Sequence, residues 1–157
     1  MRILRSIIYV PSFILFFGWI ADSVRVFDPG IDGVLPKCTR LPGTIFMIAG
    51  GVLVLTCVVV FITRGKGTPA VFDPPTEFVA SGPYAYVRNP MYIGGFILLV
   101  GFGLYRNSLS ILILSVILIA IFHLFVVYYE EPTLQKQFGK SYLEYKNRIN
   151  RWMPKWK

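Results

Sequence analysis

The sequence is poor in the residues from which many soluble active sites are built. Among 157 residues it has one histidine and two cysteines. Cys38 and Cys57 are too few for a disulfide framework, and a cysteine within an apolar run usually serves as a small apolar side chain. Metal-ligand spacing, glycine-rich nucleotide loops and a nucleophile elbow are also missing. The sequence therefore gives no support to a metal site, a P-loop or Rossmann domain, or a serine hydrolase.

Acidic residues are scarce as well. The chain has 8 Asp and Glu against 16 Lys and Arg, which gives a net charge of +8. Much of this excess lies in the C-terminal tail. Beside a bilayer, a basic tail attracts anionic lipid headgroups, at about 1 kcal/mol per residue. We expect these headgroups as partners and expect no nucleic acid.

Apolar residues are abundant, and they form four long runs. Hydrophobic residues make up 55% of the chain, and its mean hydropathy is +0.61. The runs cover residues 3–21, 43–63, 91–105 and 109–129. A membrane span needs about 20 such residues. The runs predict an all-α, polytopic membrane protein with about four transmembrane helices, in a single domain over residues 1–157. Two spans would lie in 1–63 and the functional part in 64–157.

The length and flanks of the runs refine this topology. The run 91–105 is short for a span, and its three-residue link to 109–129 predicts an antiparallel hairpin. A signal peptide is an alternative for the first run, but no suitable cleavage site follows, so a retained helix is favoured. Lys and Arg gather before the first run, after the second and in the tail, which predicts cytoplasmic N- and C-termini. We expect a prokaryotic inner membrane.

The loop before the third run reads SGPYAYVRNPMYIG, residues 81–94. Gly82-Pro83 predicts a turn, and Pro90 suits the first turn of a helix for which Asn89 is a plausible N-cap. Interfacial tyrosines are also expected at such a place. One interpretation is therefore a turn, an aromatic belt and a cap. The other is a binding site.

A pair of carboxylates follows the fourth run. The hairpin returns the chain to the side it left, so Glu130 and Glu131 should meet the 81–94 loop at one membrane face. They are either a solvated helix C-terminus, where negative charge is mildly unfavourable, or the partners of a bound cation. His123 lies two helical turns earlier and should share a face with Glu130. We favour a histidine that is hydrogen-bonded within the bundle over a functional one.

The tail predicts a short amphipathic helix. Aromatic and apolar residues recur at Phe138, Tyr142, Tyr145 and Ile149, which places them on one stripe. The stripe either faces the membrane surface or forms a wall of a small-molecule pocket over Glu130 and Glu131.

Together these segments resemble a known superfamily of membrane enzymes. The order is GPYAYVRNPMYIG, an apolar run, and then EE-x2-L-x3-FG-x2-Y-x2-Y-x5-R-x2-P. It resembles the isoprenylcysteine carboxyl methyltransferase and phospholipid methyltransferase superfamily over roughly half of the chain. The resemblance implies an all-helical membrane fold and S-adenosylmethionine (SAM) as methyl donor, with S-adenosylhomocysteine (SAH) as product.

The resemblance also implies a cofactor site. The segments that match the family's cofactor site are the G-x-Y turn, the R-x-P-x-Y stretch, the acidic pair and the Y-x2-Y of the tail. These residues are Gly82, Pro83, Tyr84, Arg88, Asn89, Pro90, Tyr92, Glu130, Glu131, Tyr142 and Tyr145. Arg88 and Glu131 are the predicted catalytic residues: the arginine takes a carboxylate of the cofactor or acceptor, and a glutamate takes the cofactor's ammonium. Many members have histidine where this chain has Asn89, which cannot titrate.

Methyl transfer needs no enzyme nucleophile, because most of the acceleration can come from positioning. The resemblance favours a lipophilic, prenylated acceptor, an isoprenylcysteine-like carboxylate. The alternative acceptor is an ethanolamine-type phospholipid, for which a glutamate or His123 would assist proton removal. A non-catalytic membrane scaffold is the alternative of another class.

Overall fold

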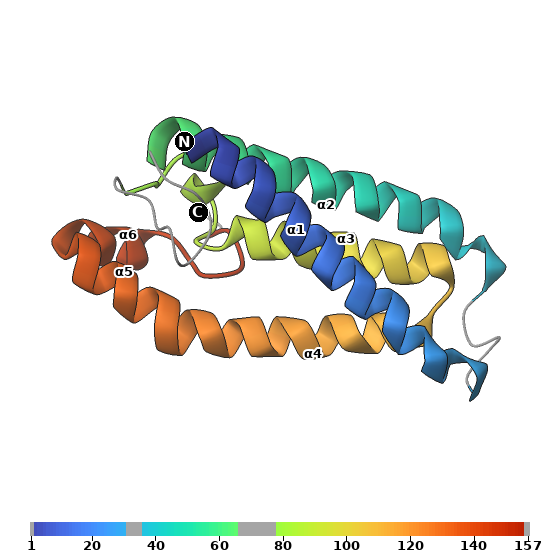
Figure 1. Cartoon of the computed structure of the whole chain (residues 1–157). Coiled ribbons are helices and arrows are strands. Elements are labelled where there is room, and N and C mark those ends of the chain that lie inside the picture. Colours follow the sequence, from blue (N-terminus) through green and yellow to red (C-terminus); the bar gives the residue numbers. More distant parts are fainter. Residues whose placement is uncertain (1, 31–35, 66–77, 156–157) are drawn as a thin grey trace.

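The computed structural model describes residues 2–30, 36–65 and 78–155, and these form helices and turns with no strand (Figure 1). The long helices are α1 (Arg2–Ser23), α2 (Arg40–Val60), α3 (Pro90–Arg106) and α4 (Leu109–Phe125). Two shorter helices follow, α5 (Glu131–Phe138) and α6 (Lys140–Arg148). Short 3₁₀ helices cover Val24–Gly30, Lys37–Thr39 and Gly82–Ala85. The all-helical prediction is confirmed for the described residues.

Two of the helices are extended by single π-helical turns. α2 continues through Phe61–Gly65, and α4 continues through Val126–Glu130 into α5. By length and composition, two continuous helices in the described part of the chain are able to cross a membrane, Arg40–Gly65 and Leu109–Phe138. α3 is apolar but has 17 residues. The four-span topology and the cytoplasmic termini stay predictions.

The α3–α4 hairpin is present as predicted. Asn107 ends α3 in the left-handed conformation, with φ of 55°, which asparagine tolerates better than most residues. Ser108 then caps α4, because its Oγ accepts a hydrogen bond from the Ile111 N–H at 3.2 Å. The tight link places the start of α3 beside the far end of α4.

Glycines bring α2 and α3 into close antiparallel contact. A Cβ built on Gly43 would lie 2.5 Å from the backbone nitrogen of Tyr105, and one on Gly50 would lie 2.6 Å from the carbonyl oxygen of Gly94. On α3, a Cβ on Gly101 would lie 2.6 Å from the Met47 nitrogen. Small residues at helix interfaces allow this approach, which is a common basis of packing within membranes.

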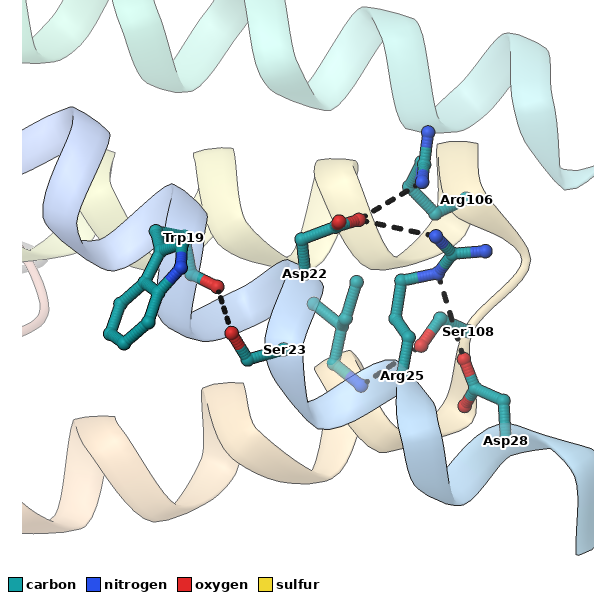
Figure 2. Close-up of polar contacts among 8 residues, drawn as sticks. Trp19, Asp22, Ser23, Arg25, Asp28, Arg106 and Ser108 are labelled. Atoms are coloured by element: carbon teal, nitrogen blue, oxygen red, sulfur yellow. Dashed lines mark hydrogen bonds and ion pairs between the residues drawn. The ribbon is translucent and has the colours of Figure 1, made fainter.

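Polar contacts fasten the helix ends at the hairpin tip (Figure 2). Asp22 Oδ1, at the end of α1, lies 2.9 Å from Arg106 Nη2 and 3.1 Å from Arg25 Nη1. Asp28 accepts a hydrogen bond from the Ser110 N–H at 3.1 Å. Burial raises the pKa of Asp28, but hydrogen bonds from Ser108 and Ser110 outweigh this and leave it lowered. The carboxylate form of Asp28 therefore ties the segment after α1 to the start of α4.

Three expected details need correction. Glu130 and Glu131 do not end a helix, because α5 continues to Phe138. The predicted tail helix is present as α6, but it starts after Gly139, whose φ of 54° separates it from Phe138 at the end of α5. Asn89 holds the N-cap position of α3 but makes no side-chain cap hydrogen bond, and its Nδ2 donates to the Arg151 carbonyl oxygen.

The glycine contacts make a direct prediction. Gly50→Ala should lower the stability of the protein by about 1–3 kcal/mol, because the added methyl group meets backbone atoms of α3. Gly51→Ala is the matched control, since the nearest atom to its Cβ is a leucine methyl carbon at 4.0 Å. Thermal unfolding in detergent measures both variants. Equal melting temperatures would contradict close packing at Gly50.

Candidate functional site

The 81–94 loop is held between the end of α2 and the tail. Gly82 has a φ of 61°, which favours glycine, and opens the 3₁₀ turn Gly82–Ala85 that Pro83 continues. The Tyr84 ring packs edge-on against Phe61, with centroids 5.2 Å apart. The Tyr145 hydroxyl donates a hydrogen bond to the Tyr84 carbonyl oxygen at 2.7 Å. Through Tyr84 the turn is thus fixed to the extension of α2 on one side and to α6 on the other.

A buried carboxylate lies at the centre of this region. Glu131 is 3% exposed, and three cations surround it. Arg151 Nε lies 2.6 Å from Oε1 and its Nη2 lies 3.2 Å from Oε2. Arg88 Nη1 lies 3.0 Å from Oε1, and Lys146 Nζ lies 3.1 Å from Oε2. We call these four residues the Glu131 cluster.

The Glu131 cluster joins three separate segments of the chain. Arg88 precedes α3, Lys146 belongs to α6, and Arg151 follows α6. The hydrogen bond to Glu131 raises the pKa of Arg151, so the guanidinium is held in its charged form. Removing two charges from water is costly, and it is tolerated when hydrogen bonds satisfy both partners. Three cations against one carboxylate leave a positive excess.

Glu130, the neighbouring carboxylate, has a different environment. Its Oε2 accepts a hydrogen bond from the Tyr92 hydroxyl at 2.8 Å. Among the described residues, no lysine or arginine forms an ion pair with it. The π-helical turn Val126–Glu130 contributes to the difference, because it changes the register of the helix just before Glu131. Glu131 therefore pairs with three cations, whereas Glu130 keeps a carboxylate oxygen for a further partner.

Arg88 also has capacity for a further partner. Its side chain is 9% exposed, and its Nε and Nη1 have no hydrogen-bond partner in the part of the chain that the structure describes. Nη1 makes only a charge contact with Glu131. A buried donor without an acceptor costs about 1–3 kcal/mol. An anionic ligand would remove this cost.

Backbone and side-chain contacts fasten the C-terminal tail over the start of α3. The Arg88 N–H donates to the Asn150 carbonyl oxygen at 2.9 Å, and Asn89 Nδ2 donates to the Arg151 carbonyl oxygen at 3.4 Å. Trp152 Nε1 donates to His123 Nδ1 at 2.9 Å. The favoured interpretation of His123, as a hydrogen-bonded histidine, is confirmed. Tyr92 and Trp152 lie between it and Glu130, with ring centroids 6.4 Å apart.

The aromatic stripe of the tail packs on the protein. Phe78 lies against Phe138, Tyr142 and Tyr145, with ring centroids 5.4, 5.9 and 5.0 Å away. Burial, followed by the charge of Glu131, raises the pKa of Tyr142 to about 12. Tyr142 and Tyr145 are 2% and 4% exposed, so they support the loop from behind and offer little free ring face.

The structure brings the predicted site residues together at one end of the bundle. The contact of Arg88 with Glu131 and that of Tyr92 with Glu130 confirm the predicted meeting of the loop and the acidic pair. Gly82, Pro83 and Pro90 shape the backbone there. Four further residues lie in this region although no sequence pattern predicted a specific contact for them: Phe78, Lys146, Arg151 and Trp152. Arg151 had one signal, because it belongs to the resemblance motif.

Comparison of the sequence with known families agrees with this site. A sequence model described as phospholipid methyltransferase matches residues 38–141. The chain belongs to the phospholipid methyltransferase family. The matched region includes Arg88, Tyr92 and both glutamates, and it ends before Lys146 and Arg151. A direct comparison with curated proteins gives no match. Membership indicates methyl transfer at a membrane.

The Glu131 cluster predicts a large effect of one substitution. Glu131→Gln should destabilise the protein by about 3 kcal/mol, because three cations would lose their shared charge. Glu144→Gln, on the exposed side of α6, is the control and should leave stability unchanged. Thermal unfolding and limited proteolysis of the tail measure the effect. A Glu131→Gln protein as stable as the control would show that the cluster does not hold the tail.

Proposed function

We propose that the protein is a SAM-dependent methyltransferase that acts on a lipophilic acceptor at the cytoplasmic face of the membrane. The observation that supports this best is that Glu130 and Arg88, which carry opposite charges, each have polar atoms available for a ligand. Glu130 has a carboxylate oxygen without a cation among the described residues, and Arg88 has buried donors without an acceptor. Family membership supplies the reaction class.

The residues fit the amino acid part of SAM. That part is a zwitterion, so it needs an acid and a base side by side. Glu130 Oε1 would take the ammonium while Oε2 keeps the Tyr92 hydroxyl, and Arg88 Nε would take the carboxylate. Glu130 is next in sequence to Glu131, which contacts Arg88, so the acid and the base belong to the same small region. Glu131 then has a positioning role, because it fixes Arg88.

Methyl transfer requires from the protein mainly that it positions the cofactor and the acceptor. When bound, SAM supplies a methyl group on a sulfonium that undergoes in-line displacement. Good alignment of reactants is worth roughly 7–11 kcal/mol at best. Glu130 and Arg88 hold the cofactor end, and Gly82, which has no side chain, leaves backbone groups accessible.

Two acceptor classes fit the site, each with its own support. An ethanolamine-type phospholipid is our first choice, because the matching family is described as phospholipid methyltransferase and ethanolamine supplies an amine that can be methylated. Its phosphate would also suit the positive excess of the Glu131 cluster. An isoprenylcysteine-like carboxylate is the second, since the same positive excess would bind a carboxylate. Non-catalytic scaffolding is the competing function.

Cofactor binding can be measured by calorimetric titration of the detergent-purified protein with SAH. Wild-type protein should bind at micromolar concentration, and Glu130→Gln should lose about 10- to 100-fold in affinity, because a charge-assisted hydrogen bond is worth about 1.5–3 kcal/mol. Glu130→Gln should melt near the wild-type temperature, unlike Glu131→Gln. Glu144→Gln is the control for charge. Folded wild type that binds no SAH would favour the scaffold.

The acceptor can be identified with labelled SAM and protein in nanodiscs. Phosphatidylethanolamine should take up label at a rate that rises with pH, since an amine accepts a methyl group only after it loses its proton. Phosphatidylcholine, which has no free amine, is the matched control. Label in a prenylcysteine analogue, with a rate that is flat with pH above about 6, would instead identify the carboxylate acceptor.

A further inference from the structure

A groove runs between α3 and α4 on the outer surface of the bundle. Its lining residues are Ile93, Phe96, Ile119, Ala120, His123 and Trp152. Its volume is about 380 Å³, which lies in the usual range of ligand sites, roughly 300–1,000 Å³. The helix Leu109–Phe138, which lines one side, is long and apolar enough to cross a membrane. In that position the groove would open to the hydrocarbon of the bilayer.

The two polar side chains among these lining residues, His123 and Trp152, form a hydrogen bond with each other. An indole N–H can only donate, so the hydrogen bond from Trp152 Nε1 requires His123 Nδ1 to be the acceptor. The neutral histidine then carries its proton on Nε2. The bond removes one donor and one acceptor from an otherwise apolar surface. It also fixes the indole as the inner end of the groove and leaves His123 poorly placed to act as a base through Nδ1.

One side chain, that of Tyr92, lies between the groove and the cofactor site. The Tyr92 ring lies 6.4 Å from the Trp152 ring and 5.3 Å from the Phe122 ring, and its hydroxyl donates to Glu130. Trp152 is also next in sequence to Arg151, which is paired with Glu131. A chain that fills the groove therefore ends one aromatic ring away from the two glutamates.

We propose that the α3–α4 groove holds one hydrocarbon chain of the methyl acceptor, and that Trp152, positioned by His123, is a specificity-determining residue at its inner end. The identity of the chain as that of an acceptor rests on the proposed function. The apolar lining selects hydrocarbon, and the path past Tyr92 places the attached headgroup at Glu130 and the Glu131 cluster. Headgroup and chain are then recognised by separate parts of the protein.

Quenching of Trp152 fluorescence by brominated lipid tests the proposal. Trp19→Phe and Trp156→Phe leave Trp152 as the sole tryptophan and remove Trp19, which is 67% exposed. The full chain is placed in nanodiscs that contain a small, equal fraction of either phosphatidylethanolamine or phosphatidylcholine with dibrominated chains. Bromine quenches an indole only near contact. Quenching should be at least twofold stronger with the ethanolamine lipid.

Ala120→Phe fills the groove and is the decisive variant. It should abolish the difference between the two lipids and raise KM for the acceptor about tenfold, while SAH affinity stays unchanged. Ile121→Phe is the matched control, because Ile121 is the next residue, is 52% exposed and does not line the groove. Ile119→Phe repeats the test if Ala120→Phe does not fold.

Each other outcome would overturn the proposal. Equal quenching by both lipids would make the groove a general lipid contact, and quenching that survives Ala120→Phe would place the chain elsewhere. If neither lipid quenches Trp152 and the protein self-associates as its concentration rises, the groove would be assigned to a second copy of the chain. The SAH titration is an independent test. Selective quenching without SAH binding would contradict the proposed enzymatic function and would leave a groove that binds lipid.

Discussion

The site depends on one buried carboxylate. Glu131 is shared by cations from the loop before α3, from α6 and from the tail, so a single charge joins three segments. Hydrogen bonds from Tyr145 to Tyr84 and from Arg88 to Asn150 join the same segments. A carboxylate so far from water is stable only with such partners. The remaining features follow from this arrangement: Arg88 is oriented, the tail covers the start of α3, and Glu130 is left with an oxygen for a ligand.

The arrangement of helices was largely predictable, because apolar runs and turn residues are local signals. The hairpin follows from the short polar link at 106–108. The turn at Gly82-Pro83 follows from the backbone conformations that glycine and proline favour. The break at Gly139 and the π-helical turn Val126–Glu130 were missed. Both leave the pattern of apolar residues nearly unchanged, so periodicity cannot reveal them. The number of membrane spans stays a prediction.

The site was predictable in part. Arg88, Tyr92 and the two glutamates were expected to meet, since a hairpin returns the chain to its starting face. Lys146 and Trp152 were missed, because no pattern in the sequence indicates which of many basic and aromatic residues in the tail folds back. Asn89 shows the limit of motif reasoning: its position was predicted as a cap, yet its amide donates to the tail. Only packing between distant segments decides such contacts.

The order in which the chain is made has a consequence for Glu131. During synthesis this residue emerges before Lys146 and Arg151, which come 15 and 20 positions later. Until then Arg88 is the only member of the cluster available to it. In the nascent helix hairpin, Glu131 can therefore form one ion pair, with Arg88, and lacks the hydrogen bonds from the tail. Synthesis of Lys146 and Arg151 adds the remaining partners, so a chain that terminates before them would lack the contacts that hold the tail over the start of α3.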